Sequence, residues 1–323
     1  MEESKTMSQT KREELFSQYA ANLGILKRRG VLSIEPDVTD VFICPLCYEI
    51  FPRDALTEGD NLSLEHVPPK AVGGKNIGCT LTCKQCNNEA GRVLDSALKR
   101  KLEIDDFQAR IPGAKLNVQY SPGDGLWLPA TVYANGKDSI RVENLLHPRR
   151  SSPSDRQRAS ELLEAGVDDF KMMHRQPGGH RIGIALLRIA YLYAFRVLGY
   201  GLILHPAVQQ IQAQLRAPTE DIIPSAWMFP GDLLPETRRG LNIIRRPLEL
   251  RSFVVSFDLL TPQQQIKSYA VILPIPSDWG LGVYDEFKKR AGNTELVSFQ
   301  IMKVPEDIKY LTDPDLCYSP VQS

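Results

Sequence analysis

The sequence predicts an α+β protein, and three features of the 323-residue chain support this class. First, apolar alternation and turn residues between two Cys-x-x-Cys pairs, residues 44–86, favour the order strand, loop, strand and then helix. Second, residues 115–145 alternate like strands and are interrupted by glycine-containing turns. Third, a long apolar segment, residues 184–204, predicts a buried helix, and strand-like residues return after it.

The first expected element is an amphipathic helix over residues 7–29, where apolar residues recur at helical spacing. Residues 41–51 predict a strand that enters a tight turn. LSLEHV, residues 62–67, alternates in polarity and predicts a second strand. The following PPKAVGGKN, residues 68–76, must form a loop, because its prolines and glycines interrupt regular structure. CTLTC, residues 79–83, predicts a returning strand, and a helix is expected to begin at or soon after the second cysteine pair.

Beyond residue 111 the sequence predicts a second α+β region of no recognisable class. A stretch rich in Ser, Pro and Arg, residues 147–157, is the best candidate for a linker. Helices are expected over residues 156–166 and from about residue 181 onward. Strands are expected over residues 115–120, 126–136, 139–145, 251–260, 267–276 and 295–304.

Composition and charge argue against two classes of protein. Basic and acidic residues balance at 39 each, so binding to a polyanion requires a local patch instead of bulk charge. Arg188 and Arg196 interrupt the long apolar segment and make a membrane span costly. The start of the chain, MEESKTMSQTKREE, lacks an apolar export segment. We therefore expect a cytoplasmic protein, in which paired cysteines favour metal over disulfide.

The two cysteine pairs predict a structural zinc site, because tetrahedral Zn²⁺ binds four thiolates. The four expected ligands are Cys44, Cys47, Cys83 and Cys86. Four cysteines leave no coordination position for water or substrate, so this zinc is expected to organise the region and not to catalyse. The remaining cysteines, Cys79 and Cys317, are expected to be small buried residues or tail residues.

The segment CPLC…LEHVPPKAVGGKN…LTCKQCNNEAG, within residues 44–95, resembles the HNH endonucleases, also called ββα-metal nucleases. Four features occur in the order typical of that family. They are the zinc cysteines, an acidic-His pair that ends a strand, a loop with Pro and Gly, and an Asn after the last cysteine pair. The resemblance implies an N-terminal ββα-metal domain with a structural Cys₄ zinc that hydrolyses phosphodiester bonds in DNA. It also implies a setting in restriction or phage defence, with an accessory domain for recognition or triggering.

By the resemblance, His66 is the general base that activates water, while Glu65 and Asn87 hold one Mg²⁺ or Mn²⁺ ion. These residue types suit the chemistry, because histidine titrates near neutral pH and hard cations prefer oxygen ligands. Neighbouring side chains of a regular strand point to opposite faces, so Glu65 and His66 serve one site only if the strand is irregular at its end. The double proline after Val67 is expected to cause that irregularity.

The site residues also have structural interpretations, and two positions depart from the family pattern. A histidine at a strand end is often a hydrogen-bonded structural residue, and Asn87 or Asn88 would suit a helix cap. Asn87 replaces the final histidine of the family name, a replacement that the family tolerates. The expected middle asparagine falls on Gly78, and Asn76, two residues earlier, is the candidate replacement.

The same region carries candidate contacts to phosphate. Between positions 70 and 101 the sequence has seven basic and two acidic residues in a chain that is neutral overall. Four of them are expected to contact the nucleic acid backbone, although such charges are often only solvated: Lys70, Lys75, Lys84 and Arg92. Gly73 and Gly74 are expected to allow a turn with positive φ. Arg181, Arg188 and Arg196 recur near one face of the apolar helix and are expected to form its solvated side.

The sequence suggests three segments: a helical segment 1–40, a nuclease domain 41–110, and an accessory or recognition domain 111–323. A further boundary is expected near residues 147–157.

DNA is the expected partner, while RNA stays open. Cutting of both strands would require a dimer or two visits by one protein, and the candidate protein partners are a second copy of the chain and a defence-system protein. The competing interpretation is a Cys₄ zinc module that binds nucleic acid or protein without catalysis. Glu65 and His66 discriminate between the two, because a pure zinc module does not need an acidic-His pair beside a Pro-Pro loop.

Overall fold

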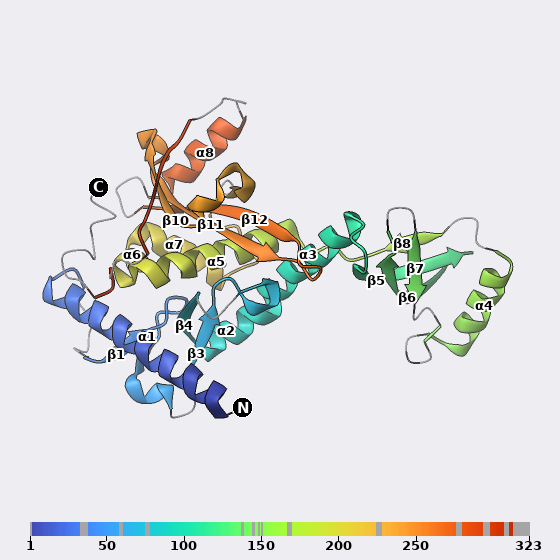
Figure 1. Cartoon of the computed structure of the whole chain (residues 1–323), viewed down its shortest axis with the longest axis horizontal. Helices are drawn as coiled ribbons and strands as arrows, with labels where there is room; N and C mark the ends of the chain where they lie inside the picture. Colours follow the sequence, from blue (N-terminus) through green and yellow to red (C-terminus); the bar gives the residue numbers. More distant parts are fainter. Residues whose placement is uncertain are drawn as a thin grey trace. The chain divides into compact units, whose positions relative to one another are not determined.

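The chain forms two compact units in the computed structural model (Figure 1). The structure describes residues 2–32, 38–57, 61–74, 78–136, 139–143, 146–147, 149, 151–166, 170–223, 228–275, 280–292, 298–306 and 310–312. Unit 1 comprises Met1–Ser96, Gly179–Leu259 and Lys267–Ser323, and unit 2 comprises Ala97–Gly178 and Leu260–Ile266. Unit 1 thus joins segments from both sides of unit 2, whereas the predicted segments follow one another along the sequence. The division into segments 1–40, 41–110 and 111–323 therefore stays a prediction.

Unit 1 begins with helix α1 (Glu2–Arg28), which confirms the predicted N-terminal helix. Its apolar stripe is buried, and the Tyr19 ring stacks on Phe195 with the ring centroids 4.6 Å apart. Strand β1 (Val41–Ile43) pairs antiparallel with β2 (Ile50–Pro52). The turn between β1 and β2 contains the first cysteine pair, so the region predicted as one strand entering a turn is a short hairpin.

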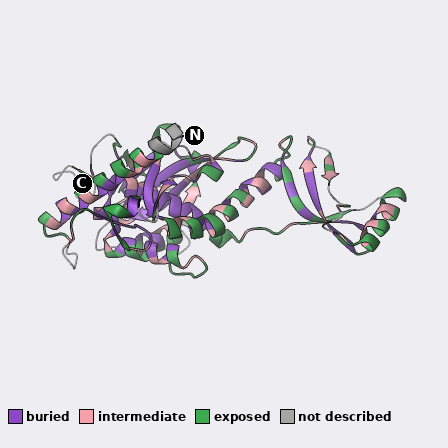
Figure 2. Cartoon of the chain, turned by 90° about the horizontal axis from the view of Figure 1, so that it is seen from below, coloured by how far each residue is buried: buried purple, intermediate pink, exposed green. Residues whose placement is uncertain are grey.

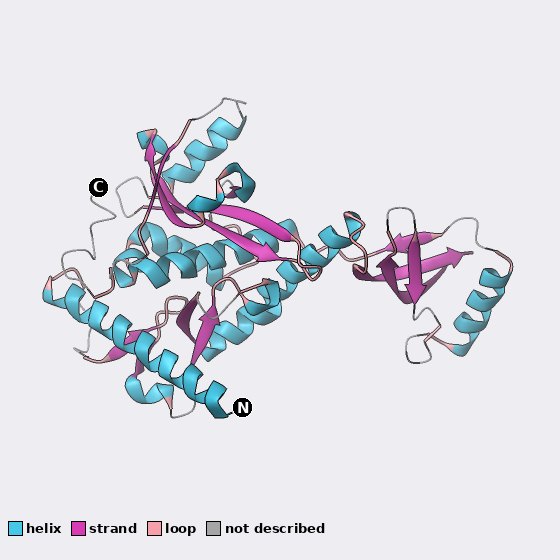
Figure 3. Cartoon of the chain, viewed as in Figure 1, coloured by secondary structure: helices cyan, strands magenta, loops and turns pink. Residues whose placement is uncertain are grey.

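The predicted order strand, loop, strand, helix is confirmed (Figure 3). Strand β3 (Leu62–His66) pairs antiparallel with β4 (Cys79–Cys83), and His66 lies opposite Cys79. Helix α2 (Lys84–Ala90) follows β4 directly. The π-helical turn η3 (Gly91–Asp95) continues it into helix α3 (Ser96–Gln108).

The long apolar segment forms α5 (Gly179–Leu198), which is followed by α6 (Tyr200–Ile203) and α7 (Pro206–Arg216). Helix α5 is buried along most of its length and contacts β4 and η3. Arg188 is only 2 % exposed, so its predicted place on the solvated side of the helix is wrong. No helix in the described part of the chain has both the length and the hydropathy needed to cross a membrane.

A five-stranded sheet completes unit 1, with the strand order β13-β10-β11-β12-β9. Its strands are β9 (Met228–Pro230), β10 (Gly240–Arg246), β11 (Ser252–Leu260), β12 (Ile266–Pro274) and β13 (Gln300–Lys303). β11, β12 and the described part of the last predicted strand are therefore confirmed. Helix α8 (Gly282–Gly292) packs beside the sheet, and its Tyr284 hydroxyl donates to the carbonyl oxygen of Ile272 at 3.1 Å. Short 3₁₀ turns are η1 (Arg53–Leu56), η2 (Lys70–Val72), η4 (Gly231–Leu233), η5 (Glu236–Arg238) and η6 (Leu248–Leu250).

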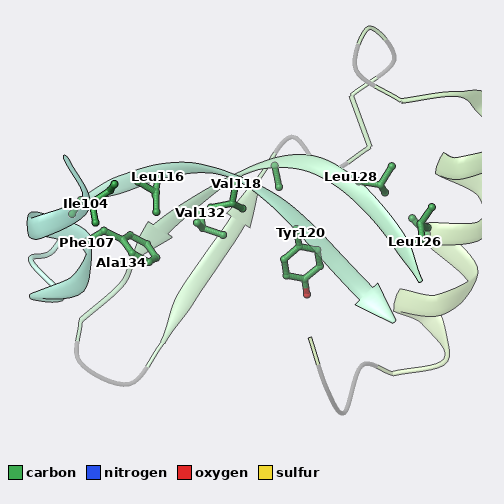
Figure 4. Close-up of a cluster of buried hydrophobic side chains, with 12 residues drawn as sticks. Ile104, Phe107, Leu116, Val118, Tyr120, Leu126, Leu128, Val132 and Ala134 are labelled. Atoms are coloured by element: carbon green, nitrogen blue, oxygen red, sulfur yellow. The ribbon is translucent and has the colours of Figure 1, made fainter. Parts of the chain in front are cut away.

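Unit 2 contains a four-stranded antiparallel sheet in the order β7-β6-β5-β8. Its elements are β5 (Lys115–Gly123), β6 (Leu126–Ala134), β7 (Ile140–Glu143), β8 (Lys171–Met173) and helix α4 (Pro153–Glu164). Apolar residues of β5 and β6 form the core together with Ile104 and Phe107 of α3 and Ala159 of α4 (Figure 4). Helix α4 begins inside the stretch expected to be a linker, because Ser152 caps the helix and Pro153 occupies its first turn.

Candidate active site and metal centre

The four predicted zinc ligands meet in unit 1. All four Sγ atoms lie within 4.8 Å of one another, and the Sγ atoms of Cys47 and Cys83 are 3.8 Å apart. Tetrahedral zinc with Zn–S distances of about 2.3 Å separates its sulfurs by about 3.8 Å, so the cluster fits this ion. The backbone N–H groups of Cys83 and Cys86 donate to the sulfurs of Cys44 and Cys83, each at 3.4 Å. Such donors stabilise the negative charge of thiolates.

The two cysteine pairs come from different elements, and a metal ion would join them. Cys44 and Cys47 lie in the turn between β1 and β2, where the backbone N–H of Tyr48 donates to the carbonyl oxygen of Cys44 at 2.9 Å. Cys83 ends β4 and caps α2, and Cys86 lies in the first turn of that helix. The clamp therefore fixes the junction of β4 and α2 to the first hairpin.

Helices α5–α7 hold the first cysteine turn by its backbone, which sequence analysis did not foresee. The Tyr191 hydroxyl donates to the carbonyl oxygen of Pro45 at 2.6 Å, and Nε2 of Gln212 donates to that of Leu46 at 2.5 Å. The Tyr200 hydroxyl bonds both the N–H and the carbonyl oxygen of Ile43. The sequence contained one indication of these contacts, namely polar side chains within helices that are otherwise largely apolar. These helices complete the metal centre although they follow it by more than a hundred residues.

Strand β3 stays regular through the acidic-His pair. His66 is in register with Cys79, and the backbone N–H of Val67 still donates to the carbonyl oxygen of Gly78 at 2.5 Å. The irregular strand end expected from the double proline is therefore absent from β3, because pairing with β4 continues up to the first proline. In a regular strand Glu65 and His66 point to opposite faces, so this geometry does not bring their side chains together.

Glu65 lies in a buried cluster of charges. Its Oε1 accepts a hydrogen bond from Nη1 of Arg188 at 2.8 Å, and Asp95 of η3 lies 3.8 Å from the same nitrogen. Burial raises the pKa of the Glu65 carboxyl, and the charge of Arg188 opposes that shift. Burial also raises the pKa of Asp95 to about 6, against the opposing effect of Arg188. Sequence analysis missed Arg188 and Asp95 as neighbours of Glu65, because only the packing of α5 brings them together.

His66 lies on the other face of the hairpin, beside Cys79. The Nδ1 atom of its half-buried ring is 3.4 Å from Sγ of Cys79, and either atom donates, depending on the histidine tautomer. Burial raises the pKa of the Cys79 thiol and favours its neutral form. Cys79 is thus a buried residue, as predicted, and also a direct neighbour of the candidate base. Cys317 lies outside the described residues.

Asn87 lies on the Glu65 side of the hairpin. Its Nδ2 donates to Oγ of Ser63 at 3.1 Å, and Ser63 and Glu65 alternate onto the same face of β3. The residue that caps α2 is Cys83, so the alternative role of Asn87 or Asn88 as a helix cap is wrong. Asn87 and Glu65 therefore present amide and carboxylate groups to one face, whereas His66 lies on the opposite one.

Two different constraints require glycine in the loop after β3: a left-handed backbone conformation and a lack of space for a Cβ atom. Gly73 has φ 95°, as expected for a left-handed turn. Gly74 has no positive φ, but a Cβ there would lie 1.6 Å from the carbonyl oxygen of Pro68. At Gly78 a Cβ would lie 2.3 Å from the carbonyl oxygen of Val67, which explains why no asparagine occupies the expected position.

The candidate phosphate contacts are on the surface of unit 1. Lys70 on η2, Lys84 on α2 and Arg92 on η3 are exposed. Lys75 and Asn76 lie outside the described residues. A cavity of about 610 Å³ lies beside the clamp, and its lining includes Cys47, Arg92 and Arg188. Arg92 thus borders the space next to the metal centre.

A two-stranded hairpin that runs into a helix, with a four-cysteine clamp at the junction, defines a zinc-clamped ββα domain. Residues 44–103 match the family model of the HNH endonucleases, and this match, with the cysteine cluster, identifies the N-terminal half as carrying an HNH domain with a cysteine zinc clamp. The resemblance seen in the sequence is therefore confirmed. No curated protein and no solved structure matches the chain.

Proposed function

We propose that the chain is a metal-dependent HNH endonuclease that hydrolyses phosphodiester bonds in DNA. The family match supports nuclease activity, and the four-cysteine cluster supports a structural zinc ion. The observation that carries the proposal is the match of residues 44–103, which include Glu65, His66 and Asn87, to the family model of the HNH endonucleases. By the family resemblance alone, we extend the proposal to a role in restriction or phage defence.

His66 is proposed to take a proton from the attacking water. Histidine suits this step because its ordinary pKa lies near neutral pH. When Nδ1–H donates to Sγ of Cys79, the Nε2 atom keeps the lone pair that accepts the proton.

Glu65 and Asn87 are proposed to bind one Mg²⁺ or Mn²⁺ ion, which would neutralise charge on the phosphoryl oxygens. Their oxygen donors suit a hard cation, and the contact of Asn87 with Ser63 supports a common face. Arg188 also uses the Glu65 carboxylate, so a guanidinium and a metal ion compete for it. Lys70, Lys75, Lys84 and Arg92 are proposed to contact backbone phosphates.

One observation favours a second candidate function. A carboxylate that is 4 % exposed and paired with a buried arginine is also what a purely structural role would produce. In that case the HNH domain binds nucleic acid or a protein without hydrolysing it. A third candidate keeps the proposed site and cleaves RNA.

The deciding experiment compares cleavage of supercoiled plasmid by the wild type and His66→Ala, with Mg²⁺, with Mn²⁺ and with EDTA. His180→Ala is the matched control, since His180 is an exposed histidine of unit 1 at the start of α5. We expect nicking or linearisation by the wild type and the control, a loss of at least a hundredfold in His66→Ala, and none in EDTA.

Zinc content, measured on the same samples, separates catalysis from folding. It should be unchanged in His66→Ala, because His66 is not a clamp residue. Cleavage by His66→Ala at the wild-type rate would refute the base assignment. No cleavage of plasmid or RNA by any of the proteins, with binding retained, would favour the non-catalytic module.

A further inference from the structure

One face of the unit 2 sheet differs from the other in its chemistry. Even-numbered residues of β5 and β6 are buried, most of them in the apolar core. The odd-numbered residues, apart from Ser121 and Thr131, are more exposed, and Figure 2 colours these strands by burial. The opposite side therefore consists of the odd-numbered positions. We call this side the open face, and its principal residues are Lys115, Asn117, Trp127, Tyr133, Arg141 and Lys171.

Two aromatic rings lie on the open face. Trp127 is 41 % exposed, although contact of the largely apolar indole ring with water is unfavourable. Tyr133 is half-buried, and the Arg141 guanidinium lies 4.9 Å from the centre of its ring. The two residues are six positions apart on β6, which corresponds to about 20 Å along the strand. The open face therefore offers separated flat surfaces that other planar groups can stack on.

The charged residues of the open face are mostly basic. Lys115, Arg141 and Lys171 are exposed on three different strands. The acidic Glu143 lies 3.1 Å from Arg141 and partly neutralises it. Asn117 is also exposed, and its Oδ1 atom accepts a hydrogen bond from the Thr131 hydroxyl at 3.0 Å. The face as a whole thus complements a negatively charged ligand with planar, hydrogen-bonding groups.

We propose that the open face binds a single-stranded stretch of nucleic acid, with bases stacked on Trp127 and Tyr133 and phosphates near Lys115 and Lys171. Aromatic platforms bordered by basic side chains suit single strands, because the bases of a duplex are already stacked on one another. A protein partner is less favoured, because lysine is depleted in protein–protein interfaces and Lys115 and Lys171 are exposed on this face. The proposal rests on the proposed function in one respect, because it names a second contact to the substrate of the same enzyme.

The test measures binding apart from cleavage. Zinc-loaded, full-length His66→Ala protein, without added Mg²⁺ or Mn²⁺, is titrated into fluorescein-labelled single-stranded oligonucleotides, of deoxythymidine or of uridine, and into a duplex. Anisotropy gives the Kd. Replacing Trp127 with Ala should weaken single-strand binding about tenfold. Trp127→Phe should retain most of the affinity, because it keeps a stacking ring. Leu163→Ala is the control, since Leu163 is 40 % exposed on α4 of the same unit.

Salt dependence supplies a readout that a merely structural role of Lys115 would not change. We expect Lys115→Ala to reduce the slope of log Kd against log salt by about 0.7 for the single strands. Far-UV circular dichroism and thermal unfolding confirm that each variant is folded, and sedimentation compares their oligomeric state.

The outcomes keep this proposal apart from the proposed function. Single-strand binding that depends on Trp127, in a wild-type protein without cleavage, supports the open face and refutes the nuclease. Cleavage by the wild type, with unchanged oligonucleotide affinity in Trp127→Ala, supports the nuclease and overturns the open face. Equal weakening by Leu163→Ala would also overturn it. A change of oligomeric state in Trp127→Ala, without a change in oligonucleotide affinity, would assign the open face to a second copy of the chain.

Discussion

Arg188 determines the surroundings of Glu65. Its side chain is 3 % exposed, and its Nη1 atom faces the carboxylates of Glu65 and Asp95. Among the described residues, its Nε and Nη2 atoms have no hydrogen-bond partner, so the guanidinium is held mainly by these two acids. Removing one partner of a buried ion pair leaves an uncompensated charge, which costs about 3–5 kcal/mol.

We predict that Arg188→Met lowers the free energy of unfolding by about 3 kcal/mol, because Glu65 is left buried without its counterion. The double variant Glu65→Gln with Arg188→Met should recover at least half of that loss. Arg196→Met is the control, since Arg196 pairs with Glu306 at a partly exposed position and should cost about 1 kcal/mol or less. Urea unfolding gives the free energy of unfolding of the zinc-loaded wild type, of the single variants Glu65→Gln, Arg188→Met and Arg196→Met, and of the double variant. Additive losses in the double variant would contradict the coupling of Glu65 and Arg188.

Residues that depend on short-range spacing were predictable, and residues that depend on packing were not. The four zinc cysteines follow from two Cys-x-x-Cys spacings, and the structure places them together. Arg188 and Glu65 are 123 positions apart, and no local pattern relates them. The helix position of Arg188 suggested a solvated side chain, because periodicity does not reveal a polar partner on the buried face. The regular pairing of β3 up to Val67 was likewise hidden by the two prolines that follow.

At the scale of elements, helices α5–α7 act as the support of the first cysteine turn. Tyr191, Tyr200 and Gln212 bond successive parts of its backbone and leave the sulfurs to the metal. Backbone hydrogen bonds of this kind contribute about 1 kcal/mol each, so their loss should loosen the turn without unfolding it. The geometry of the clamp is therefore set partly by elements outside the matched HNH segment.

Zinc release should report this support. Tyr191→Phe removes only the hydroxyl that donates to Pro45, and we predict about fivefold faster transfer of zinc to a chromogenic chelator. Tyr193→Phe is the matched control, because the Tyr193 hydroxyl donates to Glu306 instead. Its release rate should equal that of the wild type. Equal rates for both variants would show that α5 does not restrain the clamp.

The strands and helices themselves were largely predictable, because alternation and helical periodicity are local. The hairpin of β3 and β4, helix α5 and strands β5, β6, β11 and β12 all occur where polarity patterns favour them. Strand β10, GLNIIRR, was missed, since its residues are buried on both sides and show little alternation. The start of α4 was placed in a linker, although Ser-Pro at positions 152 and 153 is a common helix start.

At the scale of the whole molecule, the metal centre is expected to organise unit 1 but not unit 2. Cys83→Ala removes a ligand, a helix cap and the junction of β4 with α2, so we predict loss of zinc and a protease-sensitive unit 1. Residues of unit 2, which have their own apolar core, should stay protected. Zinc analysis measures the metal content, and limited proteolysis with mass mapping shows which unit is cleaved. Cys79→Ala, on the same strand outside the cluster, should keep its zinc. A zinc-loaded, fully active Cys83→Ala protein would refute the clamp.

The division of the chain was beyond sequence analysis for a physical reason. Linkers are recognised by local composition, but unit 1 is assembled from segments that are distant in sequence. The contacts that join them, such as Tyr19 with Phe195 and Glu65 with Arg188, exist only after folding. The HNH domain was recognisable because its residues are consecutive from the first cysteine to α3.

Because unit 2 is inserted in the sequence of unit 1, the two parts of unit 1 are synthesised at different times during translation. All four zinc ligands and His66 are made before residues 97–178, whereas Arg188, Tyr191 and Gln212 come after them. At ordinary rates of synthesis this delay lasts on the order of ten seconds. A growing chain therefore holds the metal ligands and the candidate base while the counterion of Glu65 and the supports of the first cysteine turn are still missing. A chain cut short within residues 97–178 of unit 2 would contain the four zinc ligands and His66 but would lack Arg188 and the helices that support the first cysteine turn.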